Sequence, residues 1–431
     1  MTGDQAALTV PGGKGDGMEV RIVEAVSKHE LLDFCRFPMR LYAGCPYFVP
    51  PLLMDELETF NPAKNPAFDT ADARLFMALR GDEIVGRIAG ILSPAANKKD
   101  NVRDVRFGWF DCLNDPEAAK ALFDAVAEWG CKWGMETISG PHGFSLFDRE
   151  GMLVEGFDRM PTFATYYNHA YYQDLVEGYG FGKRYDFVEY RTENIDQKEF
   201  PARVSDLADK VLARGKFRVL PFRNRREIRA VGDEIFALVE EAYMDLADMV
   251  PFTKKQIQYY IPKFMPFVHR ELLKVVVTGD GEMAGFMLAM PSLSEALRKA
   301  NGRLLPFGFL HMIKALRKFD TLDFCLAAVR KKYRGKGVDL IMAREMFRSA
   351  KALGIKYTES NPELESNMRI QSEWKHFDPI QHKRRRIYEM RIAEARIVPF
   401  RDPRPALHAA PAREAIAANF AGLGDASLLG V

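Results

Sequence analysis

The sequence predicts an α+β protein made of two tandem domains, each a mixed, mainly antiparallel sheet flanked by helices. The chain has 431 residues, and at roughly 150 residues per domain this length suits two or three domains. The same order of elements, β-α-β-β-β-α-β-α-β, can be followed twice along it, and each half contains a hairpin signal, at Gly81-Asp82 and at Gly279-Asp280-Gly281. Because strands and helices do not alternate strictly, a doubly wound parallel sheet is excluded.

The first half is predicted to form a domain over residues 18–191. Its sequence patterns indicate a strand at 18–25, a helix at 28–41, strands at 74–80, 83–92 and 105–112, a helix at 116–133, a strand at 136–140 and an aromatic closing segment at 166–190. Pro116 supports the start of the second helix, since proline is favoured in the first turn.

The second half repeats this order and is predicted to form a domain over residues 217–395. The patterns indicate a strand at 217–221, a helix at 224–247, strands at 273–278, 282–290 and 322–329, a helix at 338–353, a strand at 356–360, a helix at 368–375 and a strand at 385–391. We expect residues 192–216 to be a linker. The Gly-rich residues 1–17 are expected to be disordered, and the Ala- and Pro-rich residues 396–431 a flexible tail.

Charge and cysteine content exclude several classes of protein. Lys and Arg number 61 against 59 Asp and Glu, a balance that argues against a nucleic-acid partner. The five cysteines contain no CxxC pair, which argues against a disulfide scaffold and a Cys-rich zinc site. The eight histidines contain no HExxH motif, and we predict no metal. The cysteine pattern indicates a reducing compartment, so we expect a cytoplasmic protein. No apolar run reaches ~18 residues, and the first residues do not resemble a signal peptide, so we do not expect a membrane-spanning protein.

The sharpest local signal is the segment LDFCLAAVRKKYRGKGVDL at residues 322–340. An apolar strand ends at Val329, five cations follow, and a helix is predicted to begin at Val338. Gly335 and Gly337 would let backbone N–H groups converge on an anion, and the helix N-terminus adds its positive end. The segment therefore predicts a pyrophosphate site, with a basic loop that merely starts a helix as the alternative. It matches neither a P-loop nor a GxGxxG fingerprint.

This segment resembles the GNAT superfamily of acyl-CoA-dependent N-acyltransferases, whose pattern is a strand, R/Q-x-x-G-x-G/A and a helix. The resemblance covers residues 217–392 well and residues 18–191 only as a degenerate copy, which has LNDPEAA in place of the glycine loop. It implies acyl-CoA as co-substrate. Asp339 stands where the family has Gly or Ala, so the sequence departs from the family pattern at the start of the helix. The cofactor-binding residues that it implies are Val329, Arg330, Arg334, Gly335, Lys336, Gly337, Val338 and Asp339.

The tandem arrangement also resembles a bacterial group of double-GNAT proteins that contains ceramide synthases. The shared-looking segments are FRFPMRLY…PYFVPPL, ISGPHGFS and TESNPELESNMR. This resemblance implies transfer of a long acyl chain from acyl-CoA to a sphingoid amine. Two alternatives stay open: a small-molecule or amino-acid N-acetyltransferase of the same fold, and a non-catalytic module that binds acyl-CoA or lipid.

An amine must lose a proton to form an amide, so a base or an ordered water is needed. Glu359, at the end of the strand that faces the cofactor in this superfamily, is our first candidate for that role. Asn361 and Asn367 would hydrogen-bond the pantetheine or the amine, unless they serve a turn and a helix cap. Tyr388 is a candidate proton donor to the leaving thiolate, and His142 a candidate acid–base residue; their alternatives are a core tyrosine and a loop histidine.

Residues 292–319 form a basic insertion before the strand that leads to the glycine loop. It has six cations against Glu295 alone, and four apolar residues share one helical face: Phe309, Leu310, Ile313 and Leu316. A basic amphipathic segment of this kind is typical of peripheral membrane contact, here at the inner membrane. Two alternatives stay open: the segment covers the acyl chain of the donor, or a helix packs its apolar face on the sheet.

Overall fold

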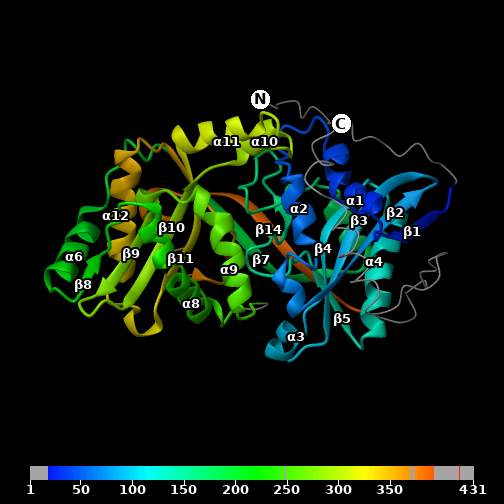
Figure 1. Cartoon of the computed structure of the whole chain (residues 1–431), viewed down its shortest axis with the longest axis horizontal. Coiled ribbons are helices and arrows are strands. Elements are labelled where there is room, and N and C mark those ends of the chain that lie inside the picture. Colours follow the sequence, from blue (N-terminus) through cyan, green and yellow to red (C-terminus); the bar gives the residue numbers. More distant parts are fainter. Residues whose placement is uncertain (1–17, 247–248, 369–370, 372–373, 393–416, 418–431) are drawn as a thin grey trace. The chain divides into compact units, whose positions relative to one another are not determined.

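The structure is a computed structural model that describes residues 18–246, 249–368, 371, 374–392 and 417 (Figure 1). Contacts between Cα atoms divide these residues into two compact units. Unit 1 holds the described residues within Met1–Asp186, Leu297–Phe309 and Arg385–Val431, and unit 2 holds those within Phe187–Ala296 and Leu310–Arg384. The disorder predicted for 1–17, the tail predicted for 396–431 apart from residue 417, and part of the helix predicted at 368–375 lie outside the described residues.

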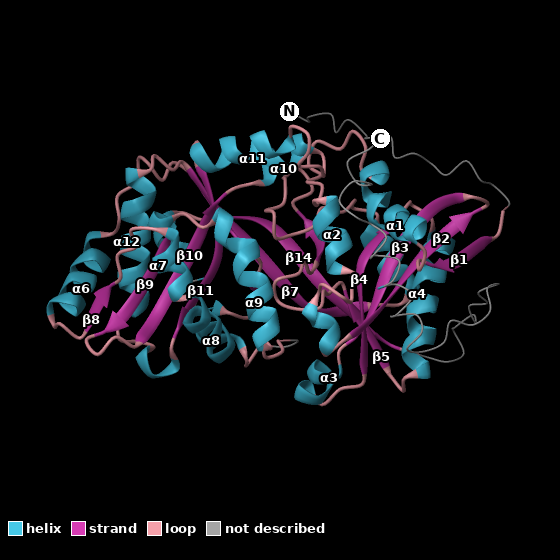
Figure 2. Cartoon of the chain, viewed as in Figure 1, coloured by secondary structure: helices cyan, strands magenta, loops and turns pink. Residues whose placement is uncertain are grey.

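Unit 1 is built on a mixed sheet in the order β1-β2-β3-β4-β5-β14 (Figure 2). The first four strands are antiparallel neighbours, β4 and β5 run parallel, and the Tyr388–Arg391 part of β14 is antiparallel to β5. The strands are β1 (Val20–Glu24), β2 (Asp72–Arg80), β3 (Glu83–Leu92), β4 (Asp104–Cys112), β5 (Thr137–Gly140) and β14 (Ile380–Arg391), with a short β6 (Met152–Glu155).

Both faces of the unit 1 sheet are covered. Alternate residues of a strand point to opposite faces. Leu75 and Met77 of β2 accordingly belong to a core shared with α1 and α2, whereas Phe76 and Ala78 belong to a core shared with α4. The helices are α1 (Lys28–Leu41), α2 (Leu53–Thr59), α3 (Pro94–Asp100), α4 (Pro116–Lys132) and α5 (Tyr172–Tyr179), with a 3₁₀ turn at Pro66–Asp69.

Unit 2 repeats this plan with the strand order β7-β12-β11-β10-β9-β8. Its one described parallel pair is β11–β12, and the other neighbours are antiparallel. The strands are β7 (Gly182–Thr192), β8 (Phe217–Val219), β9 (Leu273–Thr278), β10 (Met283–Pro291), β11 (Thr321–Val329) and β12 (Tyr357–Ser360), with a short β13 (Glu363–Leu364) beside β7. The mixed, mainly antiparallel sheets that the sequence predicts are confirmed in both units.

Helix α12 and helix α6 pack together in unit 2. Val338, Ile341 and Met342 of α12 share a core with Val211 of α6 and Val276 of β9. The helices of the second half of the chain are α6 (Ala202–Ala213), α7 (Arg225–Ala230), α8 (Gly232–Tyr243), α9 (Lys254–Phe264), α10 (Ser294–Ala300), α11 (Gly308–Arg317) and α12 (Val338–Ala352), with 3₁₀ turns at Met265–Phe267, Arg270–Leu272, Lys331–Tyr333 and Lys375–Phe377. Among them, the end of α10 and the start of α11 belong to unit 1.

The units differ from the predicted bounds 18–191 and 217–395 at their closing strands. The end of β7 pairs with β12 in unit 2, and the end of β14 pairs with β5 in unit 1, so each half of the sequence supplies the closing strand of the other half's sheet. Residues 192–216, predicted as a linker, contain the packed helix α6. The single helix predicted at 224–247 is two helices, α7 and α8, which meet at Val231 and Gly232.

Candidate active site

The loop between β11 and α12 has the backbone that its glycines predict. Gly335 and Gly337 adopt left-handed φ values of 72° and 85°, which residues with a Cβ rarely adopt. A Cβ on Gly335 would have no heavy atom within 4 Å, so the backbone there faces open space. A Cβ on Gly337 would lie 2.8 Å from Val211 on α6, because α12 begins tightly against that helix. Gly335 is therefore the position where an anion can approach the backbone.

Helix α12 begins without a side-chain cap. Its N-cap is Gly337, whereas the corresponding helix of unit 1, α4, is capped by Asp115, whose carboxylate accepts hydrogen bonds from the amides of Glu117 and Ala118. In the first turn of α12 the Asp339 carboxylate accepts a hydrogen bond from the amide of Leu340, at 3.1 Å. Unit 1 thus fills its helix N-terminus with its own carboxylate, while the start of α12 has glycine at the cap.

Three of the five loop cations have acidic partners. Arg330 contacts Glu241 at 2.8 Å, Lys331 contacts Asp245 at 2.9 Å, and Lys332 contacts Glu282 at 2.7 Å. Hydrogen bonds from Lys332 and Tyr333 hold the pKa of Glu282 below its ordinary value.

Arg334 and Lys336 differ from these three, because both side chains are exposed and neither has an ion-pair partner among the described residues. The Arg334 Nε donates to the carbonyl of Val329, and the Lys336 ammonium lies over the Tyr333 ring. These two cations are the ones available to a phosphate group.

Strands β11 and β12 separate before they reach this loop. They pair in parallel from Thr321–Tyr357 to Phe324–Ser360, after which the Asn361 amide donates to the Phe324 carbonyl. No described strand pairs with this side of β11 from Cys325 to Val329. At ~3.3 Å per residue, the open edge is ~16 Å long. It runs from the point of separation to the glycine loop.

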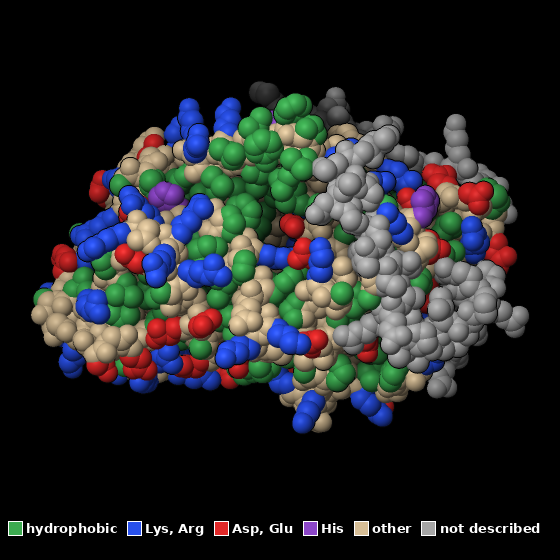
Figure 3. Space-filling model, in the orientation of Figure 1, with side chains coloured by type: hydrophobic (Ala, Val, Ile, Leu, Met, Phe, Trp, Pro, Cys, Tyr) green, Lys and Arg blue, Asp and Glu red, His purple; other side chains and the backbone are tan. Residues whose placement is uncertain are grey.

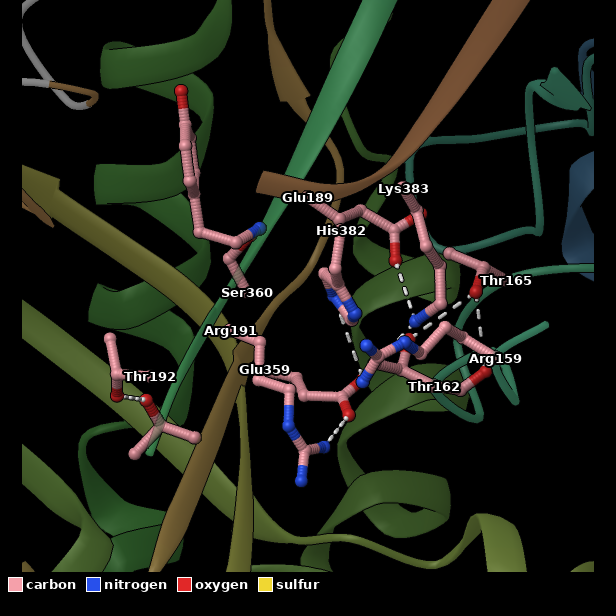
Figure 4. A network of polar contacts seen from close by, with 12 residues as sticks. Arg159, Thr162, Thr165, Glu189, Arg191, Thr192, Glu359, Ser360, His382 and Lys383 are labelled. Carbon is pink, nitrogen blue, oxygen red and sulfur yellow. Dashed lines mark hydrogen bonds and ion pairs between the residues drawn. The ribbon is translucent and has the colours of Figure 1, made fainter. Parts of the chain in front are cut away.

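A charged cluster lies where β11 and β12 separate, and Figure 4 shows its side chains. We use "charged cluster" for Glu189, Arg191, Glu359 and Lys383. One Glu359 oxygen lies 2.6 Å from Arg191 and the other 3.2 Å from Lys383, whose ammonium also lies 3.4 Å from Glu189. Lys383 and Glu189 are fully buried. The predicted base Glu359 therefore stands between two cations.

Two further ionisable residues adjoin this cluster, and the sequence analysis missed both. Asp323 of β11 is fully buried opposite Glu359, and burial, with the nearby Glu359 charge, raises its pKa to about 8. His382 of β14 has an imidazole nitrogen 3.9 Å from Glu359, and burial followed by the Lys383 charge lowers its pKa to about 4. An acidic residue within the apolar run of β11 was the available signal for Asp323.

The other predicted site residues lie elsewhere. Asn361 directly follows β12, and the amide of Asn367 donates to the carbonyl of Leu364. Tyr388 and His142 belong to unit 1: the Tyr388 hydroxyl donates to Glu177 at 3.1 Å, and the buried His142 donates its amide to Phe107 and faces Glu150 at 3.5 Å. Burial raises the pKa of Tyr388. The roles predicted for these residues stay predictions.

The residues that the structure describes contain neither a membrane-spanning helix nor a cluster of metal ligands. None of the helices described is both long and apolar enough to cross a bilayer. Across the ranges that the structure describes, no three or more His, Cys, Asp or Glu side chains are grouped so that they would hold a metal ion.

Sequence comparison finds two curated bacterial proteins that match over most of the chain. A bacterial ceramide synthase from Caulobacter vibrioides is 26% identical over 86% of this chain and 97% of its own length. The protein YghO from Escherichia coli is 27% identical over 85% of this chain and 94% of its own length. No model of a protein family matches the chain.

Structural comparison finds GNAT proteins. The glucosamine N-acetyltransferase region of a fungal multi-domain β-N-acetylglucosaminidase, a GCN5-related protein, matches 86% of this chain and 38% of that chain, with a TM-score of 0.53 and 11% identity. A tandem GNAT protein of the clavulanic acid pathway matches 87% of this chain and 99% of that chain, with a TM-score of 0.49 and 12% identity. The match to the fungal region, with a TM-score above 0.5, shows that the chain has the GNAT fold. The predicted N-acyltransferase activity agrees with the name of the Caulobacter relative, a bacterial ceramide synthase, which the chain resembles over most of its length.

Proposed function

We propose that the chain is an acyl-CoA-dependent N-acyltransferase whose CoA site is the loop between β11 and α12. The observation that carries the proposal is the combination of an open glycine backbone at Gly335 with two exposed cations, Arg334 and Lys336, beside an uncapped helix start. Backbone N–H groups at a helix N-terminus favour phosphate groups. In this proposal Val329 and Arg330 shape the loop, Val338 anchors α12, and Asp339 lies beside the pyrophosphate.

The open edge of β11 supports a reaction site at the charged cluster. A ligand anchored by its pyrophosphate at the glycine loop can lie along Cys325–Val329, and its other end then reaches the separation of β11 and β12 after ~16 Å. Asp323 and Glu359 stand at that point. Holding two substrates there in a reactive orientation supplies much of the rate enhancement that amide formation needs.

The reaction itself needs few protein groups. The amine nitrogen attacks the thioester carbon, the C–N bond forms, the C–S bond breaks, and the proton lost by nitrogen balances the proton gained by the thiolate. A carboxylate or imidazole near the attacking nitrogen is suited to accept that proton. Candidate groups in unit 2 are Glu359, Asp323 and His382, with Asn361 and Asn367 as candidate hydrogen-bond partners of the substrates.

We propose a long acyl chain as donor group and a lipid amine, such as a sphingoid base, as acceptor. The similarity to a bacterial ceramide synthase along 86% of the chain supports this substrate class. A long acyl chain also offers binding energy, since each buried CH₂ contributes about 0.8 kcal/mol.

An exposed apolar segment supports the proposal that the enzyme acts at a membrane surface. Phe307 is 70% exposed. It is one of six large apolar side chains that are exposed within residues 304–313: Leu304, Leu305, Phe307, Phe309, Leu310 and Ile313. Only Met312 is buried in α11, so the alternative of an apolar face packed on the sheet does not describe this helix. Figure 3 shows apolar side chains gathered over α11.

Exposed cations adjoin the apolar segment, namely Arg303, Lys314, Arg317 and Lys318. An apolar surface with a cationic rim fits a bilayer that contains anionic lipids. We therefore propose peripheral contact between this segment and the cytoplasmic face of the inner membrane, where a lipid amine would be met.

One experiment separates this proposal from its alternatives. The purified chain is incubated with a sphingoid base and either palmitoyl-CoA or acetyl-CoA, and the amide product is measured by mass spectrometry. A higher kcat/KM with palmitoyl-CoA is expected. A preference for acetyl-CoA would favour a small-group N-acetyltransferase, and CoA binding without any amide product would favour a non-catalytic module.

A further inference from the structure

Asp323 and Glu359 occupy facing positions near the end of the parallel pair β11–β12. Only one register pair, Phe324–Ser360, separates them from the point where the strands part. On the other side of β12, Glu359 is in register with Arg191 of β7. Three ionisable residues thus form one row across three strands, and residues in register on neighbouring strands point to the same face.

The cations of the charged cluster already have acidic partners without Asp323. Arg191 and Lys383 contact Glu359 and Glu189 at 2.6–3.4 Å, and Arg191 also contacts Glu193 at 3.1 Å. Ionisation of Asp323 would add a further, uncompensated negative charge in a buried position. Burial and the Glu359 charge accordingly raise the pKa of Asp323 to about 8, against the opposing effects of the Ser292 hydroxyl and Lys383.

The two carboxyl groups differ in their hydrogen bonds. Both oxygens of Glu359 are engaged, one by Arg191 and the other by Lys383. Neither oxygen of Asp323 has a hydrogen-bond partner of good geometry among the described residues, although the Ser292 hydroxyl is near. Buried polar groups usually have a hydrogen-bond partner. We therefore expect the Asp323 carboxyl group to gain a hydrogen-bond partner when a substrate binds.

We propose that Asp323 is the catalytic residue that accepts the proton of the attacking amine, and that Glu359 is a positioning residue that keeps Asp323 able to do so near neutral pH. The proposal rests on the acyltransferase function proposed above. The amine approaches where β11 and β12 separate, its nitrogen bonds to the thioester carbon, and its proton passes to a carboxylate oxygen of Asp323. The C–S bond breaks, and the same proton is returned to the thiolate, so the enzyme is unchanged.

The surroundings of Asp323 suit this role. A base is most efficient when its pKa lies near the working pH, and a surface aspartate with a pKa near 4 is far from that range. The charged and polar groups that act on Asp323 are Glu359 of β12, Glu189 of β7, Lys383 of β14 and Ser292 after β10. The thiol of Cys325 is also close, with its sulfur 3.3 Å from the Asp323 carbonyl, and its raised pKa keeps it uncharged.

The test compares pH profiles of kcat/KM for the full chain with palmitoyl-CoA and a sphingoid base. The wild-type profile is expected to rise with pH through about 8. Asp323→Asn should lower kcat/KM by about 100-fold or more while CoA affinity, measured by calorimetry, stays unchanged. Glu359→Gln should move the rise to lower pH, because a negative charge beside Asp323 is removed, and should lower kcat/KM less than Asp323→Asn does. The matched control is Asp320→Asn, because Asp320 is an exposed aspartate just before β11. This variant should change neither kcat/KM nor the pH at which kcat/KM rises.

The opposite pattern would overturn the proposal. If Asp323→Asn keeps wild-type activity and the same rise with pH, the rise belongs to the amine and Asp323 is not the base. If Glu359→Gln abolishes activity instead, Glu359 is the base. A wild-type chain that binds CoA but forms no amide would contradict the proposed function itself. That result separates a failure of the proposed function from a failure of the role proposed for Asp323. Infrared spectra provide a readout without substrate. The protonated carboxyl C=O band at pH 6 should be stronger in wild type than in Asp323→Asn, and an equal band in both would also overturn the proposal.

Discussion

Glu282 lies 2.7 Å from Lys332 and 3.5 Å from Arg330, and its charge offsets the cations of the glycine loop. The Tyr333 hydroxyl donates to the same carboxylate at 2.6 Å. Glu282 therefore holds one side of the loop in place and withdraws Lys332 from a phosphate ligand. The cations that remain available to a phosphate ligand are Arg334 and Lys336, which follow Tyr333 in the same loop.

The Glu282–Lys332 pair predicts that Glu282→Gln strengthens CoA binding. The variant removes a negative charge near the proposed pyrophosphate site and frees Lys332. Because the pair is exposed, the expected gain is small, about two- to fivefold in Kd. Calorimetric titration with CoA measures it, and the gain should shrink at high salt. Weaker binding by a folded variant would mean that Glu282 shapes the loop more than it opposes the ligand.

The two loop glycines predict different outcomes on substitution by valine. Gly335→Val meets open space, so its cost in folding is the left-handed backbone alone, about 1–2 kcal/mol, while its side chain blocks the anion. Gly337→Val also meets Val211 and should lower stability further. Thermal unfolding and CoA titration are measured on both. A folded Gly335→Val variant with wild-type CoA affinity would contradict a phosphate site at this loop.

The exposed apolar segment predicts salt-dependent binding to anionic vesicles. The double variant Phe307→Ser and Leu310→Ser removes two exposed apolar side chains and should reduce co-sedimentation with phosphatidylglycerol vesicles. The triple variant Lys314→Glu, Arg317→Glu and Lys318→Glu changes three local charges from +3 to −3 and should abolish it at low salt, since each cation near the surface is worth about 1 kcal/mol.

Trp133→Ser is the matched control for this segment, because Trp133 is 58% exposed but lies outside residues 304–313. Its vesicle binding should equal that of wild type. If all variants sediment alike, the segment does not contact the membrane.

The buried Asp323 predicts a pH dependence of stability. Its folded-state pKa of about 8 is above the ordinary value, so the folded chain retains a proton that the unfolded chain loses. Wild-type stability should therefore fall as pH rises from ~4 to ~8, by up to about 1.4 kcal/mol per pH unit from this group. His382 acts oppositely below pH ~6.5, because its lowered pKa favours the folded state as pH rises. Urea unfolding of wild type and Asp323→Asn should show a stability difference that shifts in favour of the variant across this range; a constant difference would contradict the shift.

Local signals explain what the sequence predicts well. The strand predicted at 322–329 and the helix predicted at 338–353 match β11 and α12 within a residue at each end. Apolar periodicity and glycine position are properties of short segments, so both elements and the loop between them could be inferred. The cations of the loop are also evident from the sequence. Their partners Glu241, Asp245 and Glu282 lie 50–90 residues away, so the number of loop cations available to a ligand could not be inferred.

Long-range pairing explains what the sequence does not predict. The charged cluster joins Arg191 to Glu359 across 168 residues and Glu189 to Lys383 across 194 residues. Their proximity depends on β7 closing the sheet of unit 2, although β7 follows the elements of unit 1 in the chain. No local pattern indicates that exchange of closing strands. Helix α6 lies within residues 192–216, which are predicted to be a linker between the two halves.

Titration of CoA into the wild-type chain and three loop variants tests the central claim most directly. Arg334→Ala and Lys336→Ala each remove a cation with no acidic partner among the described residues, whereas Lys331→Ala removes one that Asp245 already neutralises. A hydrogen bond to a charged group is worth about 1.5 kcal/mol, so each of the first two variants should weaken CoA binding about tenfold, and Lys331→Ala by less than about twofold. Equal affinity in all four proteins, or an equal loss in all three variants, would contradict a CoA site built on Arg334, Gly335 and Lys336.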